Sequence, residues 1–549
     1  MKQTNIITVL IIALFASTAY GQQERSFEQT KSLEIFNSLY REVDLFYVDT
    51  IQPGKFIRTG IDAMLNSLDP YSEYMEESET DDLMYITTGE YGGIGAGVMF
   101  RDGKVFIPEV FEGTPAAEAG ILPGDVIIKV DTTNVAGFTV SQVSNLLKGQ
   151  ANTPIRIELE RPGTEGTVVK EFYRRKIVVN TVPYWGVVGT STGYIRLTNF
   201  TDKSAQEVKN AFLDLKENKK IQSLVLDLRD NPGGVMESAI QIVNFFVPKG
   251  SPILTTKGKT RQADREYRAT LDPLDLKIPI VVLINSGSAS ASEILSGALQ
   301  DLDRAVLIGT RSFGKGLVQS PRSLPYNGLL KLTTAKYYIP SGRCIQAIDY
   351  THRNADGSVG AVPDSLTKEF ATSKGRIVRD GGGVTPDRLV EPERSPNILF
   401  YLVRDFLTHD YVTEFGLKHP TIAPAAEFEL TDEQYRDFTE LVKSRNFTYD
   451  RQSERLLKDL RRMMEFEGYY DNAKEEFDNL EAKLNHNVER DLETFKPQIK
   501  QLLEELICKR YYREKGEVQQ ALKESKEVII AVELLAKPDE YKSLLMPKK

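Results

Sequence analysis

The spacing of apolar residues divides the chain into stretches with different predicted structures. From residue 22 to 84 the apolar residues recur every three or four positions, as Leu33, Phe36 and Leu39 do, which predicts amphipathic helices. From 85 to 176 short β-type runs alternate with glycines, and the stretch is long enough to fold on its own. The pattern therefore predicts an N-terminal helical region followed by a small β-rich domain.

Strand and helix patterns alternate from residue 177 to 412. The segments "SLVLDLRD" (223–230) and "PIVVLIN" (279–285) are almost continuously apolar, which is typical of strands buried on both faces of a sheet. Each is followed by a helical pattern, so this region is predicted to be a layered α/β core. From 413 to 549 charged residues dominate and apolar residues keep helical spacing, which predicts a helical C-terminal domain.

The extreme N-terminus has the pattern of an export signal. Lys2 precedes an apolar run from Ile6 to Ala16, and small residues then provide an Ala19-x-Gly21 cleavage site. The run is shorter than the ~20 residues that span a bilayer. We therefore expect residues 1–21 to be a cleaved signal peptide and the mature protein to be exported to a periplasm. The alternative is an uncleaved segment that anchors the protein to the membrane.

Composition and charge narrow the functional classes. The chain is 41% hydrophobic and 27% charged, as globular proteins are, and its net charge of −9 argues against general binding to nucleic acid. Cys344 and Cys508 form no CxxC pair, which disfavours a zinc site and leaves their redox state open. The first of the four histidines is His352, so the α/β core offers almost no histidine for catalysis.

A serine run suggests nucleophilic chemistry. The segment "NSGSASASE" (285–293) lies between a predicted strand and a predicted helix, where a hydroxyl can act as a nucleophile if a base is near. His352, in a polar loop, would be the histidine of a Ser-His-Asp triad. The other base is a lysine whose pKa is lowered by burial, and Lys315 lies between two glycines in "RSFGKGLVQ". A solvated surface turn remains the simple interpretation of that lysine segment.

Two further features bear on which serine would react. Gly233 and Gly234 follow a buried strand in "RDNPGG" and could direct an N–H group toward an oxyanion, although a plain tight turn would explain them equally well. Among the serines on alternate positions, only Ser290 has Glu or Gln three residues later. The pair Ser290 and Glu293 fits a helix capping box, and a helix N-terminus there would favour developing negative charge.

Several segments together resemble one peptidase family. The segments "GSASASEILSGALQD", "GTRSFGKGLVQ", "DLRDNPGG", "YYIPSGR" and "GVTPDRLVEP" resemble the C-terminal processing (tail-specific) serine peptidases over residues 35–395. The resemblance implies a multidomain α/β fold in which a PDZ domain (85–176) is inserted beside a serine-peptidase core. It also implies a set of site residues: the nucleophile Ser290, the general base Lys315, the lysine-orienting Gln319, and oxyanion donors from Gly233 or Gly234 and from Ala291.

The same resemblance identifies how a substrate would be held. The loop "GGIGAG" (92–97) matches the carboxylate-binding loop of PDZ domains, with Gly93, Ile94, Gly95 and Ala96 as peptide-binding residues. The expected partners are protein substrates bound by their C-terminal tails, and the chemistry needs no metal or cofactor.

Some questions stay open at this point. The chain departs from the family pattern at Tyr71 and Cys344, neither of which belongs to the implied machinery. The C-terminal helices could bind an adaptor, form a homo-oligomer or cap the core. The alternative to an active peptidase is a catalytically inactive PDZ scaffold of the same family.

Overall fold

The computed structural model divides the chain into two compact units. It describes residues 26–79, 87–354, 356–392, 395–449, 451–484 and 487–547. The expected signal peptide, residues 1–21, lies outside the described residues. One unit comprises Met1–Glu76 with Ser320–Thr333, and the other comprises Glu77–Gln319 with Thr334–Lys549. All the predicted site residues belong to the second, larger unit. Among the described residues, none of the helices has the length and hydrophobicity of a membrane span.

The smaller unit is built around the N-terminal helices. Residues 26–46 are helical, and α2 (Pro53–Asn66) follows, as the apolar spacing predicts. The short strand β1 (Glu73–Met75) pairs antiparallel with the first residues of β18 (Leu329–Tyr338), and Tyr74 faces Leu330 in the register.

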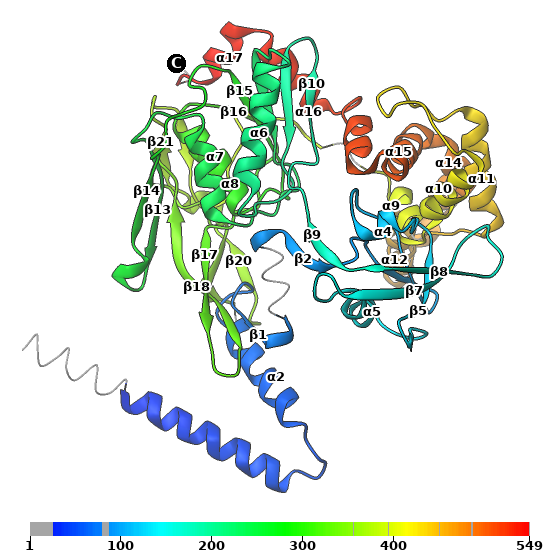
Figure 1. Cartoon of the computed structure of the whole chain (residues 1–549), viewed down its shortest axis with the longest axis horizontal. Helices are drawn as coiled ribbons and strands as arrows, with labels where there is room; N and C mark the ends of the chain where they lie inside the picture. The colour runs from blue at the N-terminus through cyan, green and yellow to red at the C-terminus, as the bar shows by residue number, and fades with distance from the viewer. Residues whose placement is uncertain are drawn as a thin grey trace, which may run out of the picture. The chain divides into compact units, whose positions relative to one another are not determined.

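A six-stranded sheet forms the centre of the larger unit (Figure 1). Its order is β10 (Tyr184–Val188), β11 (Thr192–Arg196), β12 (Ser223–Asp227), β15 (Ile280–Ile284), β16 (Val306–Gly309) and β23 (Arg388–Leu389). Strand β10 is antiparallel to β11, and every other neighbouring pair is parallel. The carboxyl ends of β12, β15 and β16 therefore share one edge, where α/β proteins place their ligand sites.

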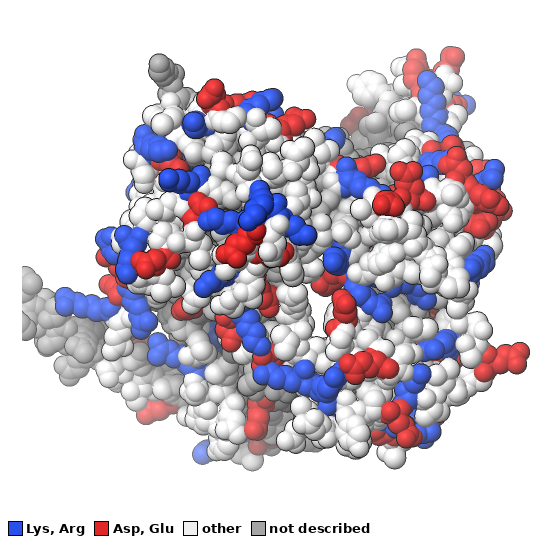
Figure 2. All heavy atoms as spheres, turned by 45° about the horizontal axis from the view of Figure 1, so that its top comes forward, with Lys and Arg blue, Asp and Glu red and all other residues white. Residues whose placement is uncertain are grey.

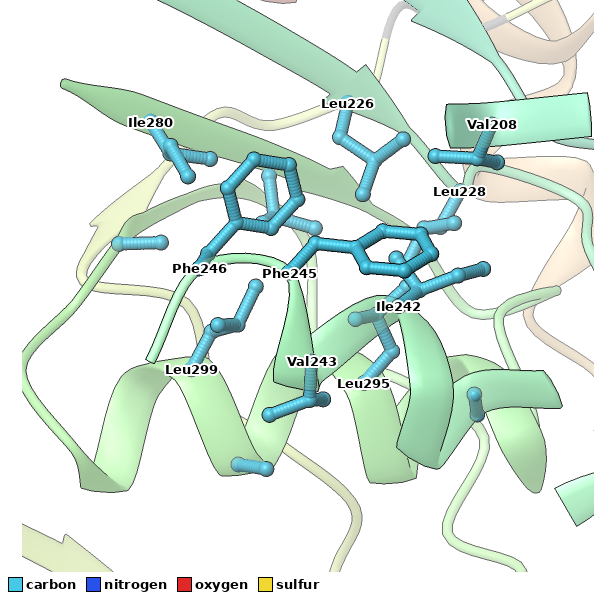
Figure 3. Packing of buried hydrophobic residues seen from close by; sticks show 14 of the residues in the cluster. Val208, Leu226, Leu228, Ile242, Val243, Phe245, Phe246, Ile280, Leu295 and Leu299 are labelled. Atoms are coloured by element: carbon cyan, nitrogen blue, oxygen red, sulfur yellow. The ribbon is translucent and has the colours of Figure 1, made fainter. Parts of the chain in front are cut away.

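One face of this sheet packs against three helices. These are α6 (Ser204–Glu217), α7 (Met236–Asn244) and α8 (Ala291–Asp301). Leu226 and Ile280 point into this layer, and Figure 3 shows Phe245 and Phe246, just after α7, packed between the strands and α8. This face is entirely apolar. Because alternate residues of a strand point to opposite faces, it takes up every second residue of each continuous apolar run in the sequence.

The opposite face is covered by the last helices of the chain. Val225, Val281 and Leu283 pack against α16 (Lys526–Leu535) and α17 (Pro538–Leu544). The Tyr541 hydroxyl accepts a hydrogen bond from the backbone N–H of Ile280 and donates one to its carbonyl, both at 3.0 Å. The end of the helical C-terminal region therefore forms the second outer layer of the α/β core.

The β-rich domain is a small module with its own core. Its sheet has the order β3 (Met99–Arg101), β4 (Lys104–Phe106), β5 (Val126–Val130), β7 (Pro154–Glu160) and β8 (Thr167–Tyr173), with β6 (Thr133–Asn134) beside β5. Helices α4 (Pro115–Glu118) and α5 (Val140–Leu147) complete the module around buried residues such as Ile107 and Ile157. Strand β2 (Glu90–Gly93) precedes this sheet in the sequence and β9 (Arg175–Val178) follows it. The two strands pair antiparallel and so bring the ends of the domain together. Strand β3 lies at the sheet edge.

The remaining C-terminal helices pack around two further apolar clusters. Helices α12 (Gln452–Glu467) and α13 (Lys474–Leu484) share a small one that contains Leu457, Tyr470 and Phe477. The others pack around a larger one: α9 (Asn397–Arg404), α10 (Leu407–Lys418), α11 (Asp432–Ser444), α14 (Val488–Thr494) and α15 (Lys496–Ala521). Tyr435, Phe438 and Ile499 are fully or almost fully buried in this cluster. The helical structure predicted from the charge-rich sequence is therefore present.

Ionic contacts join this helical cluster to the β-rich domain. Arg101, at the end of β3, forms a bidentate pair with Asp410 of α10, with N–O distances of 2.5 and 2.9 Å. The Lys509 ammonium lies 3.2 Å from the Glu109 carboxylate. Arg101 makes the stronger link, since a bidentate guanidinium–carboxylate pair fixes orientation as well as distance.

Acidic and basic side chains are mixed over the surface. On the face seen in Figure 2, acidic and basic side chains lie interspersed. Lys443 and Glu489 are typical, with a distance of 2.7 Å between two exposed side chains. Each such pair contributes less than about 1 kcal/mol, so the fold depends mainly on its buried apolar clusters.

Glu505 of α15 makes the stability of the fold depend on pH. Burial, reinforced by the like charges of Glu517 and Glu504, raises the pKa of Glu505 from 4.5 to about 7. The folded pKa exceeds the unfolded one, so stability from this group is full below pH 4.5 and is lost as pH rises through about 7. We expect Glu505→Gln to raise the free energy of unfolding at pH 8 by about 1–3 kcal/mol.

Denaturant unfolding at pH 5 and pH 8 measures this effect. The gain from Glu505→Gln should shrink toward zero at pH 5, and Glu476→Gln, at an exposed position of α13, should change neither value. An equal gain for Glu505→Gln at both pH values would contradict the assignment.

Candidate active site

The three segments with predicted chemistry follow three neighbouring strands. Strands β12, β15 and β16 are adjacent and parallel. Residues 228–234, 285–290 and 310–316 leave their carboxyl ends. Because carboxyl ends of parallel strands lie at the same edge of a sheet, the fold brings the predicted oxyanion, serine and lysine segments together.

The serines at alternate positions of the serine run, Ser288, Ser290 and Ser292, have different environments. Ser288 and Ser292 are fully buried, and their hydroxyls donate to the carbonyls of Leu228 at 2.7 Å and Asn231 at 2.9 Å. Both hydroxyls therefore hold the segment after β12 in place. The Ser290 side chain is partly exposed. Of the three, Ser290 is the serine that a substrate can reach.

Ser290 lies on a strained turn between β15 and α8. Its φ of +53° and ψ of −110° are unusual for a residue with a Cβ, and it directly precedes the first residue of α8. Strain of this kind costs about 1–3 kcal/mol and persists only where the surroundings enforce it. In α/β hydrolases a sharp strand-to-helix turn presents the nucleophile.

The buried carboxylate of Glu293 joins the serine and lysine segments. Its Oε2 accepts the backbone N–H of Ser290 at 2.8 Å and that of Lys315 at 2.9 Å. Its Oε1 accepts the Ser312 hydroxyl at 2.5 Å and the Gly314 N–H at 2.7 Å. Burial raises the pKa of Glu293, and these four hydrogen bonds oppose the shift. One carboxylate oxygen thus sets the distance between the Ser290 and Lys315 backbones.

The lysine segment is held by further contacts on both sides of Lys315. The N–H of Gly316 donates to the Gln346 amide oxygen at 2.7 Å, and the N–H of Phe313 donates to the Ser288 carbonyl at 3.0 Å. Gly314 has a φ of +90°, and a Cβ there would lie 2.4 Å from the Cβ of Ala347. Lys315 itself is partly buried.

Tyr337 provides a second bridge between the two segments. Its hydroxyl donates to the Ser290 carbonyl at 3.2 Å, and its backbone N–H donates to the Gly316 carbonyl at 3.0 Å. Tyr337 is almost fully buried. Sequence reasoning missed Tyr337 and Gln346, and it assigned Glu293 only to helix capping. The available signal for Glu293 was a carboxylate in an otherwise small and apolar helix start.

The segment after β12 lies directly against Ser290. A Cβ on Gly233 would lie 2.7 Å from the Ala289 carbonyl oxygen, 2.8 Å from the Ser290 Cβ and 2.9 Å from the Ala291 nitrogen. Only a glycine permits this approach at a φ of +101°.

The candidate oxyanion donors differ in their hydrogen bonds. The Gly233 N–H donates to the Asn231 side-chain oxygen at 2.9 Å. Within the described residues, the N–H groups of Gly234 and Ala291 donate to no protein acceptor. Both are thus available to bind developing negative charge, whereas Gly233 serves mainly to let the segment approach Ser290.

Gln319 and His352 are the other two residues that sequence reasoning connected with the base. Gln319 is the third residue of β17 (Leu317–Ser323), four residues after Lys315, and is partly buried. The His352 side chain is 87% exposed, and its Nδ1 lies 2.6 Å from an oxygen of Asp349. His352 therefore sits in an exposed polar pair, which gives no support to the triad alternative.

Backbone N–H groups from outside the predicted carboxylate-binding loop hold it in place. Gly93 ends β2, Ile94 is buried in the domain core, and Gly95 has a φ of +78°. The carbonyls of Ile94 and Gly95 accept hydrogen bonds from Ala116 and Phe111. In the part of the chain that the structure describes, the N–H groups of Ile94 and Gly95 have no protein acceptor. Ala96 continues the loop toward the edge strand β3.

Family models match three parts of the chain. Residues 191–352 match peptidase family S41, residues 106–161 match a PDZ domain, and residues 398–535 match the C-terminal helical domain of a probable PDZ-protease. The S41 match contains the serine, lysine and oxyanion segments. The α/β core, the PDZ domain and the helical domain predicted from the sequence are therefore confirmed.

Relatives with similar sequences carry consistent names. The chain is 38% identical over 348 residues to a carboxy-terminal-processing protease of Bartonella bacilliformis, covering 63% of this chain and 79% of the relative. It is 35% identical to the carboxy-terminal processing protease CtpA of Bacillus subtilis, covering 60% and 70%. A solved photosystem II D1 C-terminal processing protease is 28% identical, with a TM-score of 0.34, covering 66% of this chain and 94% of that one. This chain belongs to the carboxy-terminal-processing serine proteases of peptidase family S41.

Proposed function

We propose that this chain is an endopeptidase that cleaves proteins selected by their C-terminal tails, with Ser290 as nucleophile and Lys315 as general base. One observation carries the proposal. Glu293 accepts hydrogen bonds from the backbone N–H groups of both residues, at 2.8 and 2.9 Å, so a single buried group fixes the pair. Such fixed positioning is what a nucleophile and its base require.

The proposed reaction proceeds through an acyl-enzyme. Neutral Lys315 takes the proton from the Ser290 hydroxyl while the Ser290 oxygen attacks the scissile carbonyl carbon. The oxyanion binds the Ala291 N–H and a glycine N–H of the 233–234 pair. The C–N bond then breaks, the leaving amine takes the proton from Lys315, and an ester remains on Ser290. Lys315 next takes a proton from a water whose oxygen attacks the ester carbonyl carbon. As the bond from that carbon to the Ser290 oxygen breaks, Lys315 returns the proton to Ser290. Gln319 keeps the lysine side chain oriented.

The proposed substrate selection uses the PDZ domain. A free carboxylate would bind the N–H groups of Ile94 and Gly95, and the preceding residues would pair with the edge strand β3. The apolar run from Ile6 to Ala16 supports export as part of the same proposal.

The experiment that tests tail selection compares two forms of one unstructured substrate with an apolar C-terminus. One form ends in a free carboxylate and the other in a carboxamide. We expect kcat/KM to fall by about tenfold or more for the carboxamide, since the loop N–H groups lose a charged acceptor. Equal cleavage of both forms would contradict carboxylate recognition. Failure of the wild type to cleave either form, with normal folding, would favour the inactive PDZ scaffold.

A further inference from the structure

The C-terminal helix α16 begins beside the strand that leads to the oxyanion segment. Figure 1 shows α16, in red, next to the sheet of the α/β core, and α16 packs against β12, β15 and β16. Two polar residues lie at the start of this helix, the N-cap Ser525 and the second helical residue Glu527. Both contact Arg229, the second residue after the end of β12.

Arg229 connects α16 to a buried carboxylate. Its Nη1 donates to the Ser525 hydroxyl and to Glu527 Oε2, each at 3.0 Å. Its Nη2 donates to Asp227 Oδ2 at 2.6 Å. The Asp227 side chain is fully buried and also receives a hydrogen bond from the Tyr194 hydroxyl at 2.7 Å. The guanidinium is therefore held from two sides, and α16 supplies one of them.

Charge balance indicates why α16 contributes an acid here. Arg196 also lies 2.9 Å from Asp227, so two guanidinium groups share that one carboxylate. Burial opposes ionisation of Asp227, yet the charges of Arg229 and Arg196 hold its pKa well below the usual range. Glu527 supplies the second negative charge. Its loss would leave an uncompensated positive charge in a mostly buried cluster.

Arg229 also stands at the base of the oxyanion segment. Asp230, the next residue, has a φ of +58°, and its N–H donates to the Asn285 side chain at 2.8 Å. Asn231 follows, and its carbonyl accepts hydrogen bonds from the Ala289 N–H at 3.0 Å and the Ser292 hydroxyl. A shift of Arg229 would therefore move the segment that carries Gly233 and Gly234 and the turn that carries Ser290.

We propose that Glu527, with Ser525, is a positioning residue for the oxyanion segment and acts through Arg229, so that helix α16 is part of the catalytic apparatus. This inference rests on the proposed function and adds a residue about 300 positions away in sequence from the groups it orients. It assigns the end of the helical region a role in transition-state binding, distinct from the packing role of its apolar face.

The test compares three variants at two glutamates of α16. Glu527→Gln removes the charge, Glu527→Asp keeps it, and Glu533→Gln changes an exposed glutamate on the same helix. Each full-length protein is assayed for kcat and KM on the free-carboxylate substrate. Each is also titrated with a peptide aldehyde, which forms a tetrahedral adduct with the reactive serine. Thermal unfolding reports the folded fraction.

We expect Glu527→Gln to lower kcat about tenfold with little change in KM. This decrease is smaller than the one that follows removal of an oxyanion donor, because the donors are displaced and not lost. The aldehyde should bind about tenfold more weakly, Glu527→Asp should recover most of both values, and Glu533→Gln should match the wild type. If folded Glu527→Gln keeps wild-type kcat and aldehyde affinity, the inference is wrong while the proposed function stands. If the wild type itself neither cleaves nor binds the aldehyde, the proposed function fails.

Discussion

Replacing Ser290 by alanine is expected to lower the cleavage rate by about 10⁴-fold or more, because the attacking oxygen is lost. Lys315→Ala is expected to lower it by roughly 10³-fold, the usual contribution of a general base. Cleavage of the unstructured free-carboxylate substrate measures both effects, and thermal unfolding shows that the variants fold.

Ser286→Ala is the matched control for this pair. Ser286 is an exposed serine in the same turn, so its loss should leave the rate near that of the wild type. Substantial cleavage by folded Ser290→Ala would mean that another group attacks the substrate. Wild-type rates in Lys315→Ala would mean that the proton goes elsewhere.

The second large effect is expected from Gly233→Ala. The new methyl group would lie within 2.9 Å of atoms of Ala289, Ser290 and Ala291, so the turn or the oxyanion segment must move. We expect kcat/KM to fall by about 100-fold or more, because both the nucleophile and the oxyanion donors are displaced. Backbone strain at a φ of +101° should also lower the free energy of unfolding by about 1–3 kcal/mol.

Gly250→Ala is a control that introduces similar backbone strain without a steric clash with the nucleophile. Gly250 has a similar φ of +90°, but no atom lies within 4 Å of a Cβ at that position. This variant should lose stability and keep its kinetics. If Gly233→Ala retained wild-type kcat/KM, the close approach of residue 233 to Ser290 would have no catalytic importance.

Local sequence patterns predict much of this architecture. Alternation of strands and helices over 177–412 gives the layered core, because strands buried on both faces must be continuously apolar, as at 280–284. The same patterns place Ser290 between β15 and α8, and Lys315 in a glycine-flanked turn after β16. Parallel order then accounts for why these turns meet at one edge of the sheet.

The contacts that organise the site are less accessible to sequence reasoning. Glu293 lies three residues from Ser290, which the capping pattern reveals, but its bond to Lys315 spans 22 residues and depends on tertiary structure. The pair of Arg229 and Glu527 spans 298 residues. Helical spacing in α16 shows that one face is apolar, but it contains no information on which surface that face covers.

The C-terminal region therefore has two structural roles that composition alone did not separate. Helix α10 carries Asp410, which binds Arg101 of the PDZ edge strand. Helices α16 and α17 cover the sheet of the core. A protein truncated near residue 413 would keep Asp410 but would lose both the Lys509–Glu109 contact with the PDZ domain and the helices that cover the sheet, so its loss of activity could not be attributed to either one. Single substitutions, such as those at Glu527, are the more informative approach.

Covalent labelling measures directly whether Ser290 is a nucleophile and whether Lys315 activates it. The wild type, Ser290→Ala and Lys315→Ala are incubated with a phosphonylating serine reagent, and the modified peptide is identified by mass spectrometry. We expect one adduct on Ser290 in the wild type, none in Ser290→Ala, and labelling slowed by roughly 10³-fold in Lys315→Ala. An adduct on a different residue, or equal labelling of Ser290 with and without Lys315, would contradict this expectation.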